Sequence, residues 1–141
     1  MPNSLICIDA SLVVRLVADT TDERLPTLWR EWNEAGRQIA APTLLYYEVT
    51  NALYQYQKHQ LLTPEVVEQA LAASLSLPIR LYGESGLHPL ALRLTKRFSL
   101  PATYDAHYLA LAEQFGAEFW SADRQLIKKV QSQLDWVHLY T

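Results

Sequence analysis

Four of the fifteen acidic residues have mostly apolar neighbours, which makes them the first candidates for chemistry. They are Asp9, Glu48, Asp105 and Asp123. Asp9 ends the apolar run 5–8, and Glu48, on a helix, has leucine or alanine at three of the four positions one turn away. Burying a carboxylate that has no partner is costly. These positions therefore predict carboxylates that are paired or bound to metal.

Carboxylates gathered in one place indicate a hard divalent cation. Two like charges about 4 Å apart repel by about 4 kcal/mol at an effective dielectric constant near 20, so a cluster of them needs cations. Oxygen ligands without His or Cys suit Mg²⁺ or Mn²⁺ rather than Zn²⁺. Two such ions about 3.5–4 Å apart activate a water and stabilise the leaving oxygen in phosphodiester cleavage, and one ion supplies part of this. The four acids thus predict metal-dependent phosphodiester cleavage.

Each acid also has a simpler interpretation. Asp123 suits a helix N-cap, Asp105 a first-turn acid and Asp9 a turn after a strand. Glu113 has apolar residues behind it too, but it ranks below the four because it lies near the end of a predicted helix. Glutamates in polar first turns, such as Glu65, need no special explanation. The four acids can act together only if the fold brings them to one place.

Short apolar strands alternate with helices along the whole chain. Strands are predicted at 5–8, 39–41, 79–82, 119–121 and 136–140, and helices after Ser11, at 22–35, from Thr43 to 59, from Thr63 to Pro78, and at 86–98, 104–115 and 123–130. Ser11 and Thr43 are expected to cap the helices that follow them. Strands separated by helices predict an α/β domain with a mostly parallel sheet covered on both faces.

The predicted sheet offers the four acids a common edge. Sites in such sheets form beyond the carboxyl ends of the strands. Asp9 and Asp123 follow two predicted strands directly or almost directly, and Glu48 and Asp105 lie early in helices that could start at the same edge. We therefore expect the acids to meet there.

Composition indicates one domain over residues 1–141, because half of the residues are hydrophobic and none of the chain reads as a linker. Cys7 is the single cysteine, so a disulfide within the chain is excluded. No apolar run approaches the roughly 18 residues of a membrane span, and a cytoplasmic protein is expected. A net charge of −3 argues against a protein that coats nucleic acid through many basic residues, although bound cations would offset the acids.

Four short motifs occur in an order that belongs to a known family. They are the segment 8–11, Glu48 with Asn51, the segment 104–106 and the segment 121–124. In these motifs and their spacing the chain resembles PIN-domain proteins of the VapC toxin type over nearly its whole length. Each motif alone is weak, whereas the ordered set is fairly specific.

The resemblance implies a fold and an activity. The fold is a three-layer α/β/α sandwich with five parallel strands in the order 3-2-1-4-5. The activity is that of an Mg²⁺- or Mn²⁺-dependent endoribonuclease that cleaves RNA, forms a homodimer and is inhibited by a separate antitoxin protein. Residue by residue, Asp9, Glu48, Asp105 and Asp123 match the family's catalytic and metal-binding acids, Ser11 and Ser121 its supporting hydroxyl positions, and Asn51 a polar position beside the site.

Basic and aromatic side chains suggest partner contacts. Two groups of basic residues flank the third and fourth motifs and could bind RNA phosphates, or could simply be solvated helix faces: Arg93, Lys96 and Arg97, and Arg124, Lys128 and Lys129. Four tyrosines on the helix from Thr43 suggest a dimer face rather than a base-stacking surface: Tyr46, Tyr47, Tyr54 and Tyr56.

Other classes of protein fit the motifs less well. A phosphoaspartyl phosphatase would resemble Asp-x-Asp after the first strand, whereas the chain has Asp9-Ala10-Ser11. A signalling receiver would need paired acids early and a lysine after a late strand. Within the family, the alternatives to a toxin are a PIN protein of RNA processing and a non-catalytic module that binds RNA or protein. The intact acidic set favours the enzyme.

Overall fold

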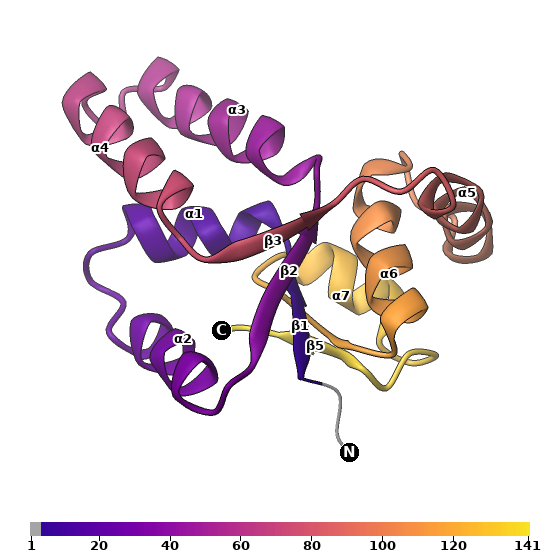
Figure 1. Cartoon of the computed structure of the whole chain (residues 1–141). Helices are drawn as coiled ribbons and strands as arrows, with labels where there is room; N and C mark the ends of the chain where they lie inside the picture. Colours follow the sequence, from indigo (N-terminus) through magenta and orange to yellow (C-terminus); the bar gives the residue numbers. More distant parts are fainter. Residues whose placement is uncertain (1–3) are drawn as a thin grey trace.

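A parallel β-sheet runs through the centre of the molecule (Figure 1). The computed structural model describes residues 4–141. Its strands are β1 (Leu5–Ile8), β2 (Gln38–Pro42), β3 (Ile79–Tyr82), β4 (Glu118–Ser121) and β5 (Val137–Leu139). They lie in the order β3-β2-β1-β4-β5, and each neighbouring pair is parallel. The five-stranded sheet and its strand order are confirmed.

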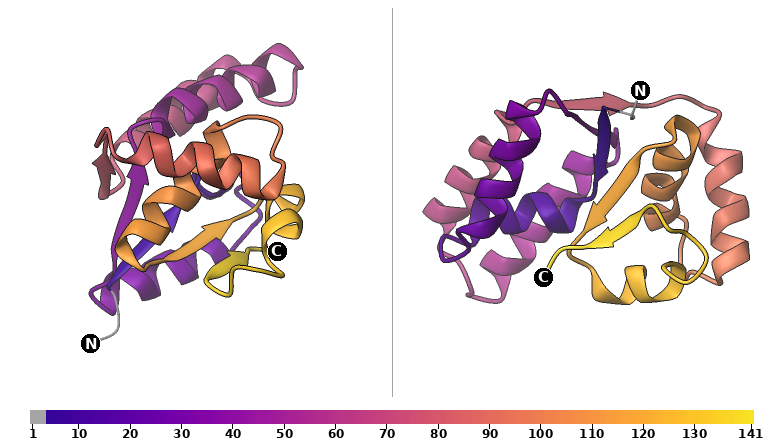
Figure 2. Two further views of the ribbon diagram at one scale, coloured as in Figure 1. Left: turned by 90° about the vertical axis from the view of Figure 1, so that its right-hand side faces the viewer. Right: turned by 90° about the horizontal axis from the view of Figure 1, so that it is seen from below.

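Helices cover both faces of the sheet. They are α1 (Ala10–Ala18), α2 (Arg24–Glu34), α3 (Leu45–Lys58), α4 (Pro64–Leu75), α5 (Leu87–Phe98), α6 (Tyr104–Phe115) and α7 (Arg124–Val130). Figure 2 shows α1 and α2 on one side of the sheet and α5 and α6 on the other. This is the predicted α/β/α arrangement. Among the helices that the described part of the chain contains, none is long and apolar enough to cross a membrane.

Buried stretches of β1 and α6 lie at the centre of the core. From Ile6 onward β1 is fully enclosed, because it lies between β2 and β4 and helices cover both of its faces. The stretch 108–112 of α6 is buried without interruption, since α6 packs on β1, β2 and β4 and also against α5. The first turn of α6, which carries Asp105, is thus fixed firmly against the carboxyl edge of the sheet.

Two predicted helix caps are wrong. Ser11 lies inside α1, and the N-cap is Asp9, whose carboxylate accepts the Leu12 amide at 3.2 Å. Thr43 does not cap α3, which begins after Leu44 with no side-chain cap. The amide of Thr43 donates to the Tyr82 carbonyl at 3.0 Å, so Thr43 still belongs to the β2–β3 ladder.

Two other signals at helix ends match the structure, whereas α2 (Arg24–Glu34) and α4 (Pro64–Leu75) are shorter than predicted. Thr63 caps α4 through its hydroxyl, with Pro64 as the first helical residue. Gly116 ends α6 in the left-handed region at φ 61°, where glycine is favoured. The second strand runs one residue further than predicted at each end, since Gln38 pairs with Leu5 and Pro42 with Tyr82. In the chain order, α1, α3 and α7 each start just after the carboxyl end of a strand, namely β1, β2 and β4.

Candidate active site

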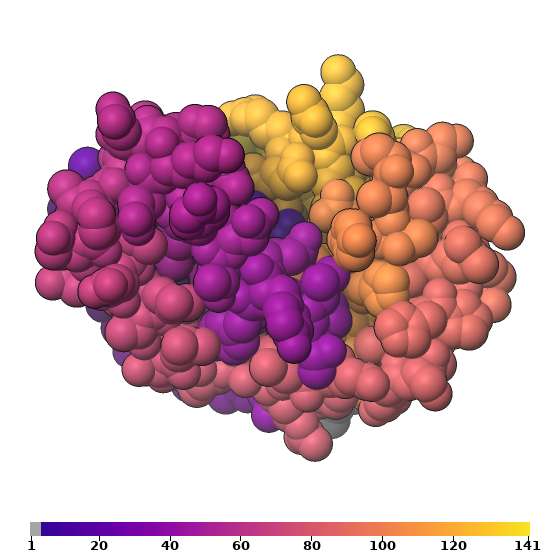
Figure 3. Space-filling view, turned by 90° about the horizontal axis from the view of Figure 1, so that it is seen from above, coloured from indigo at the N-terminus to yellow at the C-terminus, as the bar shows by residue number. Residues whose placement is uncertain are grey.

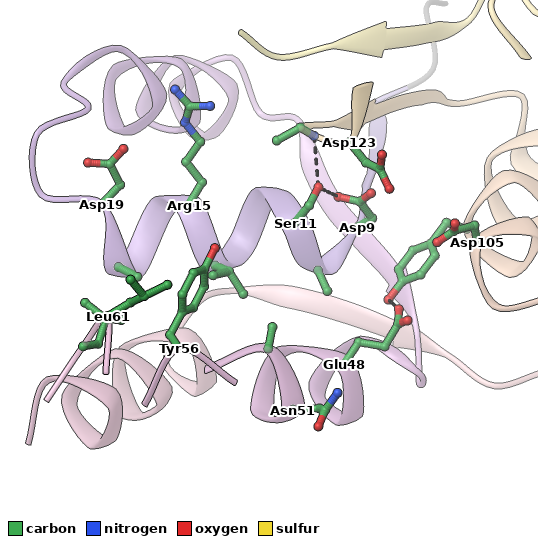
Figure 4. Close-up of a pocket in the computed structure, with 17 residues that line it drawn as sticks. Asp9, Ser11, Arg15, Asp19, Glu48, Asn51, Tyr56, Leu61, Asp105 and Asp123 are labelled. Carbon is green, nitrogen blue, oxygen red and sulfur yellow. Dashed lines mark hydrogen bonds between the residues drawn. The ribbon is translucent and has the colours of Figure 1, made fainter. Parts of the chain in front are cut away.

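The four predicted acids line one pocket at the carboxyl edge of the sheet. The pocket has a volume of about 880 Å³, and Asp9, Glu48, Asp105 and Asp123 all contribute to its wall. Seen from above in Figure 3, the surface is hollowed between α3 and α6. Figure 4 shows the acids coming from the start of α1, from α3, from α6 and from the segment after β4. The fold therefore brings the four acids together, as the strand pattern predicted.

Asp9 is the most deeply buried of the four. Its carboxylate accepts the Ser11 hydroxyl at 2.6 Å, the Leu12 amide at 3.2 Å and the Ser121 hydroxyl at 2.5 Å. Burial raises the pKa of Asp9 to about 6; the three hydrogen bonds oppose this rise, and the nearby charge of Asp105 adds to it. The negative charge of Asp9 is thus only partly compensated by the protein.

The hydroxyls of Ser11 and Ser121 tie the ends of β1 and β4 together. Ser121 also accepts the Asp123 amide at 2.9 Å, and Ser11 accepts the Ala122 amide at 3.0 Å. The Asp123 carboxylate caps α7 by accepting the amides of Gln125 and Leu126. Asp123 is therefore the N-cap that its sequence position allowed, and it lies in the acidic pocket as well.

Glu48 and Asp105 approach from helices on opposite walls. The Tyr108 hydroxyl, one turn after Asp105, donates to Glu48 Oε1 at 2.5 Å. Burial raises the pKa of Asp105, the charges of Asp123 and Glu48 raise it further, and Lys129 lowers it. Like charges thus act on one another across the pocket, which is the electrostatic condition that a cation would relieve.

The carboxylate oxygens of the pocket are the type of ligand that a hard cation prefers. The four carboxylates offer oxygen only, which suits Mg²⁺ or Mn²⁺. Within residues 4–141, however, no three His, Cys, Asp or Glu side chains are already grouped closely enough to hold a metal ion. Asp9 and Asp123 accept hydrogen bonds from hydroxyl and amide groups, and Glu48 accepts one from Tyr108. A cation at this site would be bound by carboxylates that hydrogen bonds already orient.

Of the remaining predicted residues, one lines the pocket and the others lie outside its wall. Asn51 lines the pocket, but Figure 4 shows its amide turned away from Glu48. All six predicted RNA-binding residues are exposed and lie outside the pocket wall: Arg93, Lys96, Arg97, Arg124, Lys128 and Lys129. Lys129 is the one whose charge reaches Asp105.

Arg15 and Tyr108 also line the pocket, and the sequence motifs did not identify them. Arg15 lies one turn after Ser11 on the same face of α1, and its Nε donates to Asp22 at 2.9 Å. Tyr108 lies one turn after Asp105 on α6. Helical spacing of three or four residues from Ser11 and Asp105 would have found both.

Replacing Ser121 tests the connection between the two strand ends. We expect Ser121→Ala to raise the pKa of Asp9 above its value of about 6, because one of the hydrogen bonds that lower it is lost. The variant should also lose about 1–3 kcal/mol of unfolding free energy, since the Asp123 amide loses its acceptor. Carboxyl titration by ¹³C NMR and urea unfolding measure the two effects. Ser76→Ala, at an exposed helix end, is the control, and an unchanged Asp9 titration would contradict the assignment.

Fold and site together define a class of protein, a parallel α/β/α domain that gathers carboxylates from four chain segments at one edge of its sheet. The chain belongs to the PIN domain family, because the sequence model of that family matches residues 6–131.

The chain is also similar to individual proteins of known sequence or structure. Ribonuclease VapC3 of Pyrobaculum aerophilum is 29% identical over 128 residues, which cover 88% of this chain and 93% of the relative. The crystal structure of PAE2754 from Pyrobaculum aerophilum has a TM-score of 0.66 and 25% identity, covering 88% of this chain and 78% of that one. The crystal structure of Mycobacterium tuberculosis VapC20, a sarcin-ricin loop cleaving toxin, has a TM-score of 0.62 and covers 92% of this chain and 95% of that one. At 17% identity this last match supports the fold alone. The resemblance to VapC-type PIN-domain proteins is thus confirmed.

Proposed function

We propose that this PIN-domain protein is a divalent-metal-dependent endoribonuclease and the toxin of a type II, VapBC-like toxin–antitoxin pair. The observation that carries the proposal is the meeting of Asp9, Glu48, Asp105 and Asp123 in one pocket whose carboxylates repel one another. The similarity to Ribonuclease VapC3 supports RNA as the substrate.

The four acids would hold Mg²⁺ or Mn²⁺. Their oxygen ligands suit such ions. Burial is the main cause that raises the pKa values of Asp9 and Asp105, neighbouring carboxylates raise them further, and a cation would offset both effects. When bound, the ion supplies Lewis acidity that polarises a water and the phosphate to be cut.

The protein's own side chains orient the acids. Ser11 and Ser121 hold the Asp9 carboxylate at the base of the pocket, and the start of α7 fixes Asp123 as its N-cap. Tyr108 holds Glu48 from the opposite wall. Because these elements end or begin at the same sheet edge, the phosphate would meet acids on fixed supports.

Basic side chains beside the pocket would bind the RNA backbone. Arg124, Lys128 and Lys129 belong to α7, which begins directly after Asp123. Arg93, Lys96 and Arg97 lie on α5, which packs against α6. Contacts with phosphates from these two helices would align RNA across the acids without reading its sequence.

The proposal includes two protein partners, a second copy of this chain and an antitoxin. Of the four tyrosines predicted to form a dimer face, Tyr47 is 77% exposed and Tyr54 is 53% exposed. Tyr46 donates its hydroxyl to the Ser74 carbonyl, and Tyr56 lines the acidic pocket. We assign the homodimer contact to the outer pair, and we propose that a separate antitoxin inhibits the protein in the cytoplasm, where its RNA substrate lies.

Cleavage of RNA by a Glu48 variant tests the activity. Glu48→Gln keeps the shape of the side chain but removes a charge from the pocket, so we expect at least about tenfold slower cleavage of single-stranded RNA in Mn²⁺. Glu65→Gln, on the exposed first turn of α4, is the matched control and should cut like the wild type. If both variants cleave RNA at the same rate, Glu48 does not belong to the catalytic site. A wild-type protein that binds RNA but never cuts it would favour the non-catalytic alternative.

A further inference from the structure

Tyr108 places a buried hydroxyl among the acids. Its side chain is fully buried, and its ring packs beside the Phe119 ring at a centroid distance of 6.4 Å. The backbone of α6 and this ring contact fix the direction of the hydroxyl, which reaches the wall of the acidic pocket. Tyr108 thus has a rigid ring and a single polar atom aimed at the site.

The hydroxyl contacts Glu48 and lies close to other acids. It donates to Glu48 Oε1 at 2.5 Å, a bond between residues 60 positions apart in sequence. Burial raises the pKa of Tyr108, and Glu48, Asp9 and Asp105 raise it further. Tyr108 therefore stays protonated and remains a donor.

Glu48 needs such a partner more than Asp9 and Asp123 do. Asp9 and Asp123 have short side chains held by local amides at helix starts. Glu48 has a longer, more flexible side chain on the wall of the pocket, and the charge of Asp105 repels it. Without a donor the Glu48 carboxylate would swing toward solvent, away from the other acids.

We propose that Tyr108 is a positioning residue that fixes Glu48 for cation binding. This inference rests on the proposed function, because it assigns Tyr108 a role at the same site. The hydroxyl leaves Oε2 of Glu48 available to a cation and anchors the other oxygen to α6. Hydrogen-bond partners of metal ligands typically contribute 10- to 100-fold to metal affinity.

Mn²⁺ binding to Tyr108→Phe tests the proposal. The change removes one oxygen and keeps the ring, so we expect Mn²⁺ to bind about 10- to 100-fold more weakly, measured from the electron paramagnetic resonance signal of free Mn²⁺. Tyr46→Phe is the matched control. The Tyr46 hydroxyl also donates a hydrogen bond, to the Ser74 carbonyl at 2.8 Å, but Tyr46 lies outside the acidic pocket. The control should lose comparable stability and bind Mn²⁺ like the wild type.

A double-mutant cycle shows whether Tyr108 acts through Glu48. If it does, Glu48→Gln with Tyr108→Phe should bind Mn²⁺ no more weakly than Glu48→Gln alone. Additive losses, or a Tyr108→Phe variant within about twofold of wild type, would overturn the role of Tyr108 and leave the metal site intact. A wild-type protein that binds no Mn²⁺ would overturn the proposed function and the role of Tyr108 together.

Discussion

Asparagine in place of Asp9 should abolish RNA cleavage and make the folded protein more stable at neutral pH. Cleavage falls because one of the proposed metal ligands loses its charge, and a bound metal contributes several kcal/mol to the transition state, on the order of 1,000-fold in rate. Asparagine has nearly the same shape and can still accept hydrogen bonds from the Leu12 amide and the Ser11 hydroxyl. Activity and stability should therefore change in opposite directions.

The stability gain follows from the pKa of Asp9. The folded state raises it from 3.8 to about 6, so folded protein binds more protons than unfolded protein between these values. The free energy of unfolding of the wild type therefore falls as pH rises through this window, by up to about 3 kcal/mol, since each unit of pKa is worth about 1.36 kcal/mol. Asp9→Asn has no such charge, and its stability should show a correspondingly smaller decline.

Urea unfolding of metal-free protein at pH 4 and pH 7.5 measures the difference. Asp135→Asn, on the exposed segment before β5, is the control and should match the wild type in cleavage and in pH dependence. An Asp9→Asn variant that cuts RNA at the wild-type rate would remove Asp9 from the catalytic site. A variant less stable than wild type at pH 7.5 would mean that the Asp9 charge is compensated by the protein.

Local patterns were sufficient to predict most elements of the fold. The apolar run 5–8 marks β1 because a strand enclosed on both faces needs no polar alternation. Thr63 with Pro64, and Gly116, mark helix ends through capping and left-handed backbone geometry. The strand order came from the family resemblance, because the pairing of strands far apart in sequence leaves no local pattern.

The cap errors have a different origin. A serine or threonine before an apolar helix is a common cap, but the residue that caps is the one whose oxygen reaches the first free amides. At α1 that residue is Asp9, and Ser11 turns its hydroxyl to Asp9 instead. At α3, Thr43 is still bonded within the sheet. A local contact decided the first position, and a contact between strands decided the second.

Local sequence patterns predicted the charges of the candidate site, whereas its supporting contacts came from elsewhere: the family resemblance gave Ser11 and Ser121, and Tyr108 was missed. Comparing neighbours identified the acids because a carboxylate on an apolar face is anomalous wherever the chain folds. The contacts that orient them join residues 112 positions apart for Ser121 with Asp9 and 60 apart for Tyr108 with Glu48. Such pairs appear only once the sheet brings β1, β4, α3 and α6 to one edge.

Mn²⁺ should stabilise the wild-type protein strongly at pH 7.5 and weakly at pH 5. Protons and cations compete for the same carboxylates, so a site whose Asp9 has a pKa of about 6 is largely protonated at pH 5 and open to metal at pH 7.5. The raised pKa of Asp105 acts in the same direction. At a Mn²⁺ concentration of about 100 times Kd, binding adds about 2.7 kcal/mol, roughly 10 °C in Tm for a chain of this size.

Thermal unfolding with Mn²⁺ or with EDTA at the two pH values measures this effect. The Asp9→Asn variant provides the control, because its Tm should respond little to Mn²⁺ at either pH, whereas nonspecific binding to surface acids would shift both proteins alike. A larger shift at pH 5 than at pH 7.5 would contradict competition with protons. An equal shift in Asp9→Asn would place the ion away from Asp9. Because Mg²⁺ also prefers oxygen ligands, it should reproduce the pH dependence, and the ratio of the two shifts reports which ion the pocket prefers.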